Sequence, residues 1–215
     1  MNSHLLLYIE ALQLSRLRRS SLLGLLTLLV SCVSAPPASE NGNWLLLKNQ
    51  LLELHSWELR GRVNIRYDNE SHTPRIQWQQ QNVEYSIRLW GTFNAGNTLI
   101  NGRPGFVTLE QDGEEVNAQS PEELILDQLG YELPVSYLEY WIKGIPSPES
   151  EAQLEFNVLE QLSSIRQAGW TITYSDSRQY GPLSLPARIE LTRPQNDIRM
   201  RFIGLNWTLN SDVED

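Results

Sequence analysis

The chain has 215 residues, of which 40% are hydrophobic, and its formal net charge is −9 at pH 7. This acidity argues against binding to nucleic acid and against electrostatic adhesion to anionic lipid, and we interpret it as a solvated, soluble surface. The single cysteine excludes an internal disulfide and a thiolate metal site.

The N-terminal segment has the features of a secretory signal. Arginines at positions 16, 18 and 19 precede the mostly apolar run 22–32, which reads LLGLLTLLVSC. A positive flank followed by a short apolar core is typical of a signal peptide. The core is too short for a permanent membrane helix, which needs roughly 20 apolar residues. We therefore predict that residues 1–31 are a signal peptide.

The apolar run ends at the only cysteine of the chain, Cys32. Residues 29–32 (LVSC) resemble the bacterial lipobox, whose cysteine is alkylated with a diacylglyceryl group and becomes the first mature residue. We predict lipidation at Cys32; the alternative is an ordinary signal peptide followed by an incidental thiol. The lipobox pattern also implies sorting to the outer membrane, because Val33 stands where an aspartate signals retention in the inner membrane. Two or more acyl chains would hold the protein on that membrane, facing the periplasm.

A flexible tether is expected after the anchor. Residues 34–43 (SAPPASENGN) are rich in Pro, Ser, Gly and Asn and have no apolar pattern, so residues 32–43 form the predicted anchor and tether. Without residues 1–31, 184 residues remain, with 14 basic and 25 acidic side chains and a net charge of −11. This length suits one domain with a sizeable core, which we assign to residues 44–215.

The domain opens with a predicted helix and continues as strands. Apolar residues in 44–55 have the spacing of one helical face. Strict alternation of apolar and polar residues over 57–68 then predicts a half-buried strand. Short turns connect the strands that follow, which favours an antiparallel meander. The further predicted strands are 76–78, 83–89, 98–100, 105–111, 114–118, 169–174, 187–191, 197–203 and 205–209.

Two short helices are predicted between the strand blocks. The sequence Ser-Pro-Glu-Glu at 120–123 is typical of a helix start, and a second helix follows residues 133–134. About nine strands and three short helices predict a mainly β fold, an open antiparallel barrel with a helical lid. Periodicity alone leaves open whether the interior is hollow or is a packed core.

No catalytic motif accompanies this architecture. His55 and His72 have no partner at metal-ligand spacing, and the chain contains no nucleophile elbow, phosphate-binding loop or dinucleotide fingerprint. We therefore expect no enzyme activity, no metal and no cofactor.

Several weak motifs recur in order along the predicted strands and helices after the lipobox. Their residues are Gly61, Arg62, Val63, Trp78, Gln79, Tyr85, Leu89, Pro104, Gly105, Leu109, Leu124, Gly130, Pro134, Leu138, Trp141, Ile142, Gly144, Pro146, Gly169, Trp170, Tyr174, Leu185, Pro186, Arg188, Ile189 and Trp207. Together with the lipobox, their order and spacing resemble the LolB family of outer-membrane lipoproteins, and the resemblance covers nearly the whole mature chain.

The resemblance implies a function as well as a fold. LolB-type proteins receive lipoproteins from the periplasmic carrier LolA, hold the acyl chains in an apolar cavity under helices, and insert the cargo into the inner leaflet of the outer membrane. A membrane-inserting leucine of the family falls on Phe93 here, in a loop that departs from the family's usual proline-leucine-glycine; an aromatic folded back onto the sheet is the alternative. We expect a monomer. The residues that would line the acyl-chain cavity are Val63, Ile65, Trp78, Ile87, Leu89, Leu138, Trp141 and Ile142.

Three other classes of protein fit parts of the pattern. A soluble carrier of the LolA kind would share the half-barrel but would lack the lipobox at Cys32. A non-catalytic envelope lipoprotein that scaffolds an assembly machine would have a filled core and would carry out its function on its outer surface. A periplasmic hydrolase would need a nucleophile or metal constellation that the sequence does not show.

Overall fold

The computed structural model describes residues 42–67, 69–91, 97–130 and 133–209, all within one structural unit that spans Glu40–Asp215. The predicted lipidation site Cys32 and the predicted insertion residue Phe93 lie outside the described residues. Among the described residues, no helix combines the length and the apolar character that a membrane span requires.

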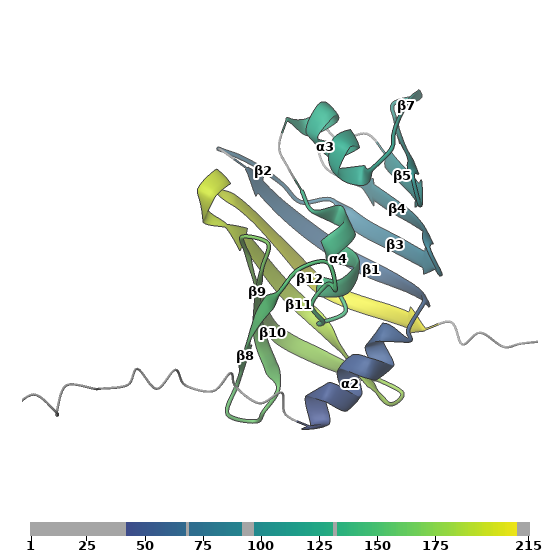
Figure 1. Cartoon of the computed structure of the whole chain (residues 1–215). Helices are drawn as coiled ribbons and strands as arrows, with labels where there is room; N and C mark the ends of the chain where they lie inside the picture. The colour runs from purple at the N-terminus through teal and green to yellow at the C-terminus, as the bar shows by residue number, and fades with distance from the viewer. Residues whose placement is uncertain (1–41, 68, 92–96, 131–132, 210–215) are drawn as a thin grey trace, which may run out of the picture. The chain divides into compact units, whose positions relative to one another are not determined.

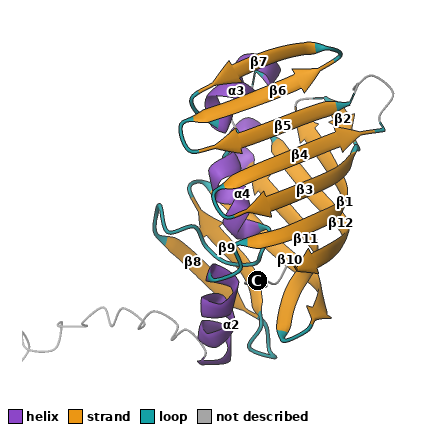
Figure 2. Ribbon diagram, turned by 90° about the vertical axis from the view of Figure 1, so that its right-hand side faces the viewer, coloured by secondary structure: helices purple, strands orange, loops and turns teal. Residues whose placement is uncertain are grey.

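One twelve-stranded antiparallel sheet makes up most of the domain (Figures 1 and 2). Its order is β7-β6-β5-β4-β3-β1-β12-β11-β10-β9-β8, with β2 paired to β1, so the sheet is open between its edge strands β7 and β8. The strands are β1 Ser56–Tyr67, β2 Glu70–His72, β3 Arg75–Gln81, β4 Glu84–Trp90, β5 Thr98–Arg103, β6 Phe106–Gln111, β7 Glu114–Ala118, β8 Ala152–Phe156, β9 Leu162–Gln167, β10 Trp170–Tyr180, β11 Leu183–Arg193 and β12 Ile198–Leu209.

The central pair, β1 and β12, joins the first and last strands of the chain. Trp57, Leu59 and Val63 of β1 are buried, while most residues between them face outward, as the alternation predicts. The register shifts at Gly61, where a Cβ would lie 2.7 Å from the side chain of Leu205. A larger residue at position 61 would therefore require the Leu205 side chain to shift, and bulges of this kind increase the local twist of a strand pair.

Three α-helices of the described residues accompany the sheet: α2 Gly42–Leu52, α3 Pro121–Leu129 and α4 Val135–Trp141. A short 3-10 helix, η1 Pro194–Asn196, lies between β11 and β12. The predicted start of α3 is confirmed, because Ser120 Oγ accepts from the Glu123 amide at 3.2 Å while the Glu123 carboxylate accepts from the Gln119 amide at 3.1 Å. Buried residues of α3 and α4 belong to the same core as the inward face of the sheet. The helices therefore cover the apolar side of the sheet (Figure 1).

The core is built around aromatic residues at the centre of the sheet. The Trp57 ring lies 5.4 Å from that of Trp78 and 5.1 Å from that of Trp207. Trp141 on α4 lies 6.3 Å from Trp170 on β10, so the helix packs on the C-terminal half of the sheet. Tilted aromatic pairs of this kind add about 0.5–1.5 kcal/mol each beyond the apolar area they bury.

The predicted fold class, an open antiparallel sheet with three helices, is confirmed. The sheet has twelve strands where about nine were expected. β2 was not predicted, and residues 154–166, whose structure the sequence left undecided, contribute to β8 and β9. The two strands expected over 197–209 are one strand, β12, which continues through Gly204 at φ +64°.

Candidate functional site

A groove of about 670 Å³ opens on the inner side of the sheet, between α4 and the turns that join β3 to β4 and β5 to β6. This volume lies within the range of about 300–1,000 Å³ that is common for small-molecule sites. The side chains that line the groove are both apolar and polar. They are His55, Trp78, Asn82, Val83, Tyr85, Arg103, Pro104, Gly105, Gln119, Ser120, Pro121, Val135, Ser136, Glu139, Tyr140 and Glu149.

Trp78 connects this groove to the aromatic core. Its ring packs against Trp57, and its indole Nε1 donates to Oε1 of Gln80 at 3.1 Å. Gln80 is itself buried and donates from Nε2 to the carbonyl of Asn82 at 3.0 Å. Because the polar atom of Trp78 is satisfied by the protein, its ring presents apolar surface to whatever enters the groove.

Tyr85 lies beside Trp78 and packs over Gly102, where a Cβ would lie only 2.1 Å from the tyrosine ring. The Tyr85 hydroxyl is buried and has no hydrogen-bond partner among the described residues. Burial, together with the negative charges of Glu122 and Glu139, raises the pKa of Tyr85 to about 12. The hydroxyl therefore stays protonated at neutral pH and can donate to a polar atom in the groove.

A basic group lies where α4 ends. Lys143 is only 2% exposed, and its Nζ donates to the carbonyl of Leu54 at 3.4 Å and lies 5.5 Å from the Tyr140 ring. Burial lowers the pKa of Lys143, although nearby Glu139 opposes this shift. Burial likewise raises the pKa of Glu139, against the effects of Lys143 and His55. These contacts link α4 to the segment that follows α2.

The C-terminal end of α4 is held by two further contacts. Trp141 Nε1 donates to Oε1 of Gln167 at 2.8 Å, and the Tyr174 hydroxyl donates to the Trp141 carbonyl at 2.8 Å. The N-terminal end differs, because Pro134 makes no side-chain cap. There the Ser136 amide donates instead to Oε1 of Glu122, on α3, at 2.8 Å.

The structure brings the eight predicted cavity residues to the inner face of the sheet and to α4. Six of them are buried among the protein's own side chains: Val63, Trp78, Ile87, Leu138, Trp141 and Ile142. Ile65 and Leu89 are partly buried against the same core. Only Trp78 of the eight also lines the groove.

Sequence reasoning missed the polar residues that support this site. Gln80 and Gln167 are buried, and each satisfies a tryptophan indole. Gln80 could have been found, because it continues the inward phase of Ile76 and Trp78. Gln167 gives no comparable signal, because its partners Trp141 and Ser147 are far away in the sequence.

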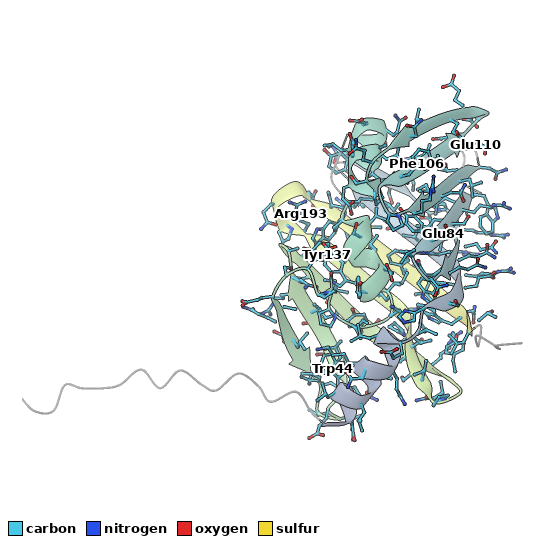
Figure 3. The ribbon with its side chains drawn as sticks, turned by 45° about the vertical axis from the view of Figure 1, so that its right-hand side comes forward. Trp44, Glu84, Phe106, Glu110, Tyr137 and Arg193 are labelled. Atoms are coloured by element: carbon cyan, nitrogen blue, oxygen red, sulfur yellow. The ribbon has the colours of Figure 1, made fainter. Side chains whose placement is uncertain are left out.

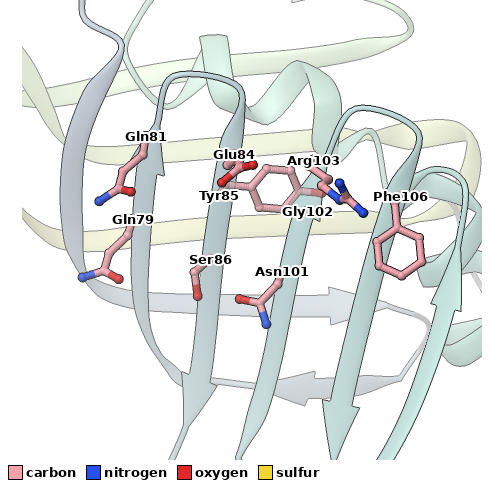
Figure 4. Close-up of a pocket in the computed structure, with 9 residues that line it drawn as sticks. All are labelled: Gln79, Gln81, Glu84, Tyr85, Ser86, Asn101, Gly102, Arg103 and Phe106. Atoms are coloured by element: carbon pink, nitrogen blue, oxygen red, sulfur yellow. The ribbon is translucent and has the colours of Figure 1, made fainter.

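The opposite face of the same strands is polar. A shallow hollow of about 310 Å³ lies over β3, β4 and β5, and Figure 4 shows Gln79, Ser86 and Asn101 along it. These residues alternate with buried ones, so the groove beside α4 and the polar hollow are on different sides of one sheet. Among the described residues, no group of three or more His, Cys, Asp or Glu side chains is placed to hold a metal ion.

This geometry defines a class of protein: an open antiparallel half-barrel whose apolar inner face is covered by helices, with a groove at the edge of that cover. The family model "Outer membrane lipoprotein LolB" matches residues 55–207. The chain belongs to the LolB family of outer-membrane lipoproteins, a non-catalytic family of lipoprotein localisation.

Individual relatives agree with this assignment. The chain is 37% identical over 193 residues to the Outer-membrane lipoprotein LolB of Chromohalobacter salexigens, which covers 88% of this chain and 89% of the relative. It is 37% identical over 158 residues to that of Pseudomonas fluorescens, covering 73% of this chain and 77% of the relative. A putative outer membrane lipoprotein-sorting protein domain from Vibrio parahaemolyticus shares the fold, with a TM-score of 0.51 at 10% identity over 80% of this chain and 94% of that one.

Proposed function

We propose that this protein, anchored through Cys32 and facing the periplasm, accepts lipoproteins from the carrier LolA and inserts them into the outer membrane as a monomer. The observation that supports this most is the groove beside α4, which leads to Trp78 and from there to the aromatic core. An acyl chain entering there meets the ring of Trp78, whose indole Nε1 already donates to Gln80.

Deeper binding requires α4 to move. The proposed cavity is lined by Val63, Ile65, Trp78, Ile87, Leu89, Leu138, Trp141 and Ile142, which now pack on one another or on neighbouring core residues. The C-terminal end of α4 is held on the sheet by Gln167 and Tyr174, whereas its N-terminal end is tied to the neighbouring helix α3 through the Ser136 amide and Glu122. The N-terminal end is therefore the one that would lift. Lifting it would extend the groove toward Leu138.

The energetics of this transfer need no nucleotide. Burying an acyl chain is favourable by about 0.8 kcal/mol per methylene, so cargo chains exposed to water would cost on the order of tens of kcal/mol. A tenfold preference for this protein over the carrier needs only about 1.4 kcal/mol. The bilayer then offers the chains a still larger apolar environment.

The insertion step is assigned to Phe93, in the segment that connects β4 to β5. Its apolar side chain is the counterpart of the family's exposed leucine and would enter the boundary between headgroups and acyl chains. The proposal predicts that Phe93→Glu still accepts lipoprotein but delivers less of it to the membrane.

The test is transfer of a labelled lipoprotein from purified LolA to the mature lipoprotein in vesicles, with acceptance and insertion measured separately. Phe106→Glu is the matched control, because Phe106 is an exposed aromatic on β6 beside Arg103. Phe93→Glu should impair insertion and Phe106→Glu should not. Wild-type insertion by Phe93→Glu would refute the loop assignment, whereas no acceptance by the wild-type protein would refute the function.

A second candidate is a non-catalytic envelope scaffold. The burial of six of the eight proposed cavity residues favours it, because a protein with a filled inner face would bind its partners on its outer surface. An apolar fluorescent probe distinguishes the two functions in a secreted form that carries Cys32→Ala. The receptor should take up the probe, while a scaffold with a permanently packed core should not.

A further inference from the structure

Two adjacent apolar side chains project into solvent at the turn between β8 and β9. Val158 is 99% exposed and Leu159 is 72% exposed. Single exposed apolar residues are common on protein surfaces, but apolar side chains that gather in one place mark sites of interaction with a protein or a membrane.

The turn that carries these residues is internally fixed. Oδ1 of Asn157 accepts from the amides of Leu159 at 2.9 Å and Gln161 at 3.0 Å, and Asn157 Nδ2 donates to Oε1 of Gln161 at 3.1 Å. The Asn157 amide also donates to the Gln161 carbonyl at 2.9 Å. Because the polar groups are satisfied within the turn, the two apolar side chains are held in solvent by a defined structure.

The same turn lies against the start of α2. Phe156 packs edge-on against Trp44 with their ring centroids 5.5 Å apart. Trp44 and Leu47 of α2 and Leu159 and Leu162 of the β8–β9 hairpin line one hollow of about 310 Å³. Figure 1 shows the beginning of α2 and the lower end of β8 side by side, and Figure 3 places Trp44 at that end of the domain.

Helix α2 adds two further exposed apolar residues at this end. Leu45 is 41% exposed and Leu46 is 67% exposed. The helix contains no acidic residue, and its only charged side chain, Lys48, lies 5.2 Å above the Trp44 ring. We call Leu45, Leu46, Val158 and Leu159 the apolar tip.

The length of chain before α2 indicates what the apolar tip meets. Nine residues lie between Cys32 and Gly42, so ten Cα–Cα steps join them, and at full extension these steps span at most about 36 Å. Once Cys32 is acylated, the start of α2 therefore cannot leave the neighbourhood of the bilayer. A protein interface would need about 800 Å² on each partner, whereas this tip consists of a few projecting side chains, which suits partial insertion between lipid headgroups.

We propose that the apolar tip is a second membrane contact, which inserts into the outer membrane beside the Cys32 anchor and orients the domain on it. This inference rests on the anchoring in the proposed function but not on acceptance of cargo. Since the mature chain is acidic, the contact is apolar in origin and should persist on zwitterionic lipid at high salt.

The experiment uses the full lipidated chain with Leu159→Cys. Cys32 is the only natural cysteine and its thiol is consumed by the lipid, so the introduced thiol can be labelled alone with a polarity-sensitive fluorophore. The protein is reconstituted in phosphatidylcholine–phosphatidylethanolamine vesicles with or without lipids that carry a quencher near the headgroup. The matched control is Glu115→Cys, because Glu115 is exposed on β7 at the other edge of the sheet.

The label at position 159 should shift to shorter wavelength and be quenched several-fold more than the label at position 115. Equal, solvent-like signals at both positions would overturn the proposal. A shift at position 159 that grows with protein density but not with quencher lipid would also overturn it, because a second copy would then cover the tip. Cargo transfer measured on the same vesicles reports the proposed function independently.

Discussion

The indole of Trp141 donates to Oε1 of Gln167, a side chain that is only 3% exposed, across 2.8 Å at the end of α4. The same glutamine donates from Nε2 to the carbonyls of Ser147 at 2.7 Å and Ser150 at 2.6 Å. One side chain on β9 thus fixes both α4 and the loop that leaves it.

Gln167→Leu should destabilise the domain by about 3 kcal/mol. The substitution keeps the volume nearly constant but leaves the Trp141 indole, the Ser147 amide and two carbonyls without this partner, and each unsatisfied buried group costs about 1–3 kcal/mol. Urea unfolding followed by tryptophan fluorescence measures the change. Gln153→Leu, at an exposed position on β8, is the control and should change stability by less than about 0.5 kcal/mol. Equal effects of the two variants would contradict the assigned role of Gln167.

Gly102→Ala should also destabilise the fold, through the ring of Tyr85. The new Cβ would lie 2.1 Å from Tyr85 Cζ, so the ring or the strand must shift, and overpacking of this kind costs about 1–3 kcal/mol. Tyr85→Ala removes the obstacle, so the double variant should lose less stability than the sum of the single variants. A double-mutant cycle with additive effects would show that the contact between Gly102 and Tyr85 is not the cause.

The raised pKa of Tyr85 predicts that the free energy of unfolding falls at alkaline pH. Its pKa is about 12 in the folded protein and 10.0 as the ordinary value, so the unfolded state loses the proton first as the pH rises. Stability contributed by the neutral hydroxyl is therefore complete below pH 10 and is lost as the pH approaches 12. In the Tyr85→Phe variant the unfolding midpoint should therefore fall less steeply with rising pH than in the wild-type chain. Some of the fall should remain, because burial also raises the pKa of Tyr174.

The measurement is urea unfolding of the secreted form with Cys32→Ala at several pH values between 9 and 12. Tyr67→Phe, which removes a tyrosine hydroxyl from the end of β1, is the matched control variant. Identical slopes for the wild-type chain and Tyr85→Phe would mean that the Tyr85 hydroxyl does not titrate differently in the two states.

The sequence predicted those parts of the fold in which local pattern and burial agree. The alternation along β1 and the cap at Ser120 both depend on neighbouring residues, and both are present. The β8–β9 hairpin was left undecided because residues 154–166 mix apolar and polar residues irregularly, and its turn places Val158 and Leu159 in solvent. Apolarity alone would have assigned those two residues to a core.

The site was harder to predict than the sheet. Inward positions on the strands and on α4 follow from periodicity, but whether they line a cavity depends on how far α4 lies from the sheet, which no local pattern encodes. The supporting polar contacts join distant residues, such as Lys143 to the Leu54 carbonyl and Tyr174 to Trp141. Such pairs become visible only when the topology is known.

Filling the groove beside α4 should block cargo acceptance without unfolding the protein. Ser136 lines the groove, and its backbone amide, rather than its side chain, makes the contact with Glu122. Ser136→Trp therefore keeps that contact while placing a large ring in the space of about 670 Å³ that an acyl chain would occupy. Acceptance of lipoprotein from LolA should fall on the order of tenfold, equivalent to about 1.4 kcal/mol, while the urea midpoint stays nearly unchanged.

Asp127→Trp, which puts the same ring on the exposed side of α3, serves as the control and should accept cargo normally. A stable Ser136→Trp variant that receives lipoprotein as fast as the wild-type protein would place the entry route elsewhere. Loss of acceptance in both variants would instead mean that the helices themselves, and not the groove, contact the carrier.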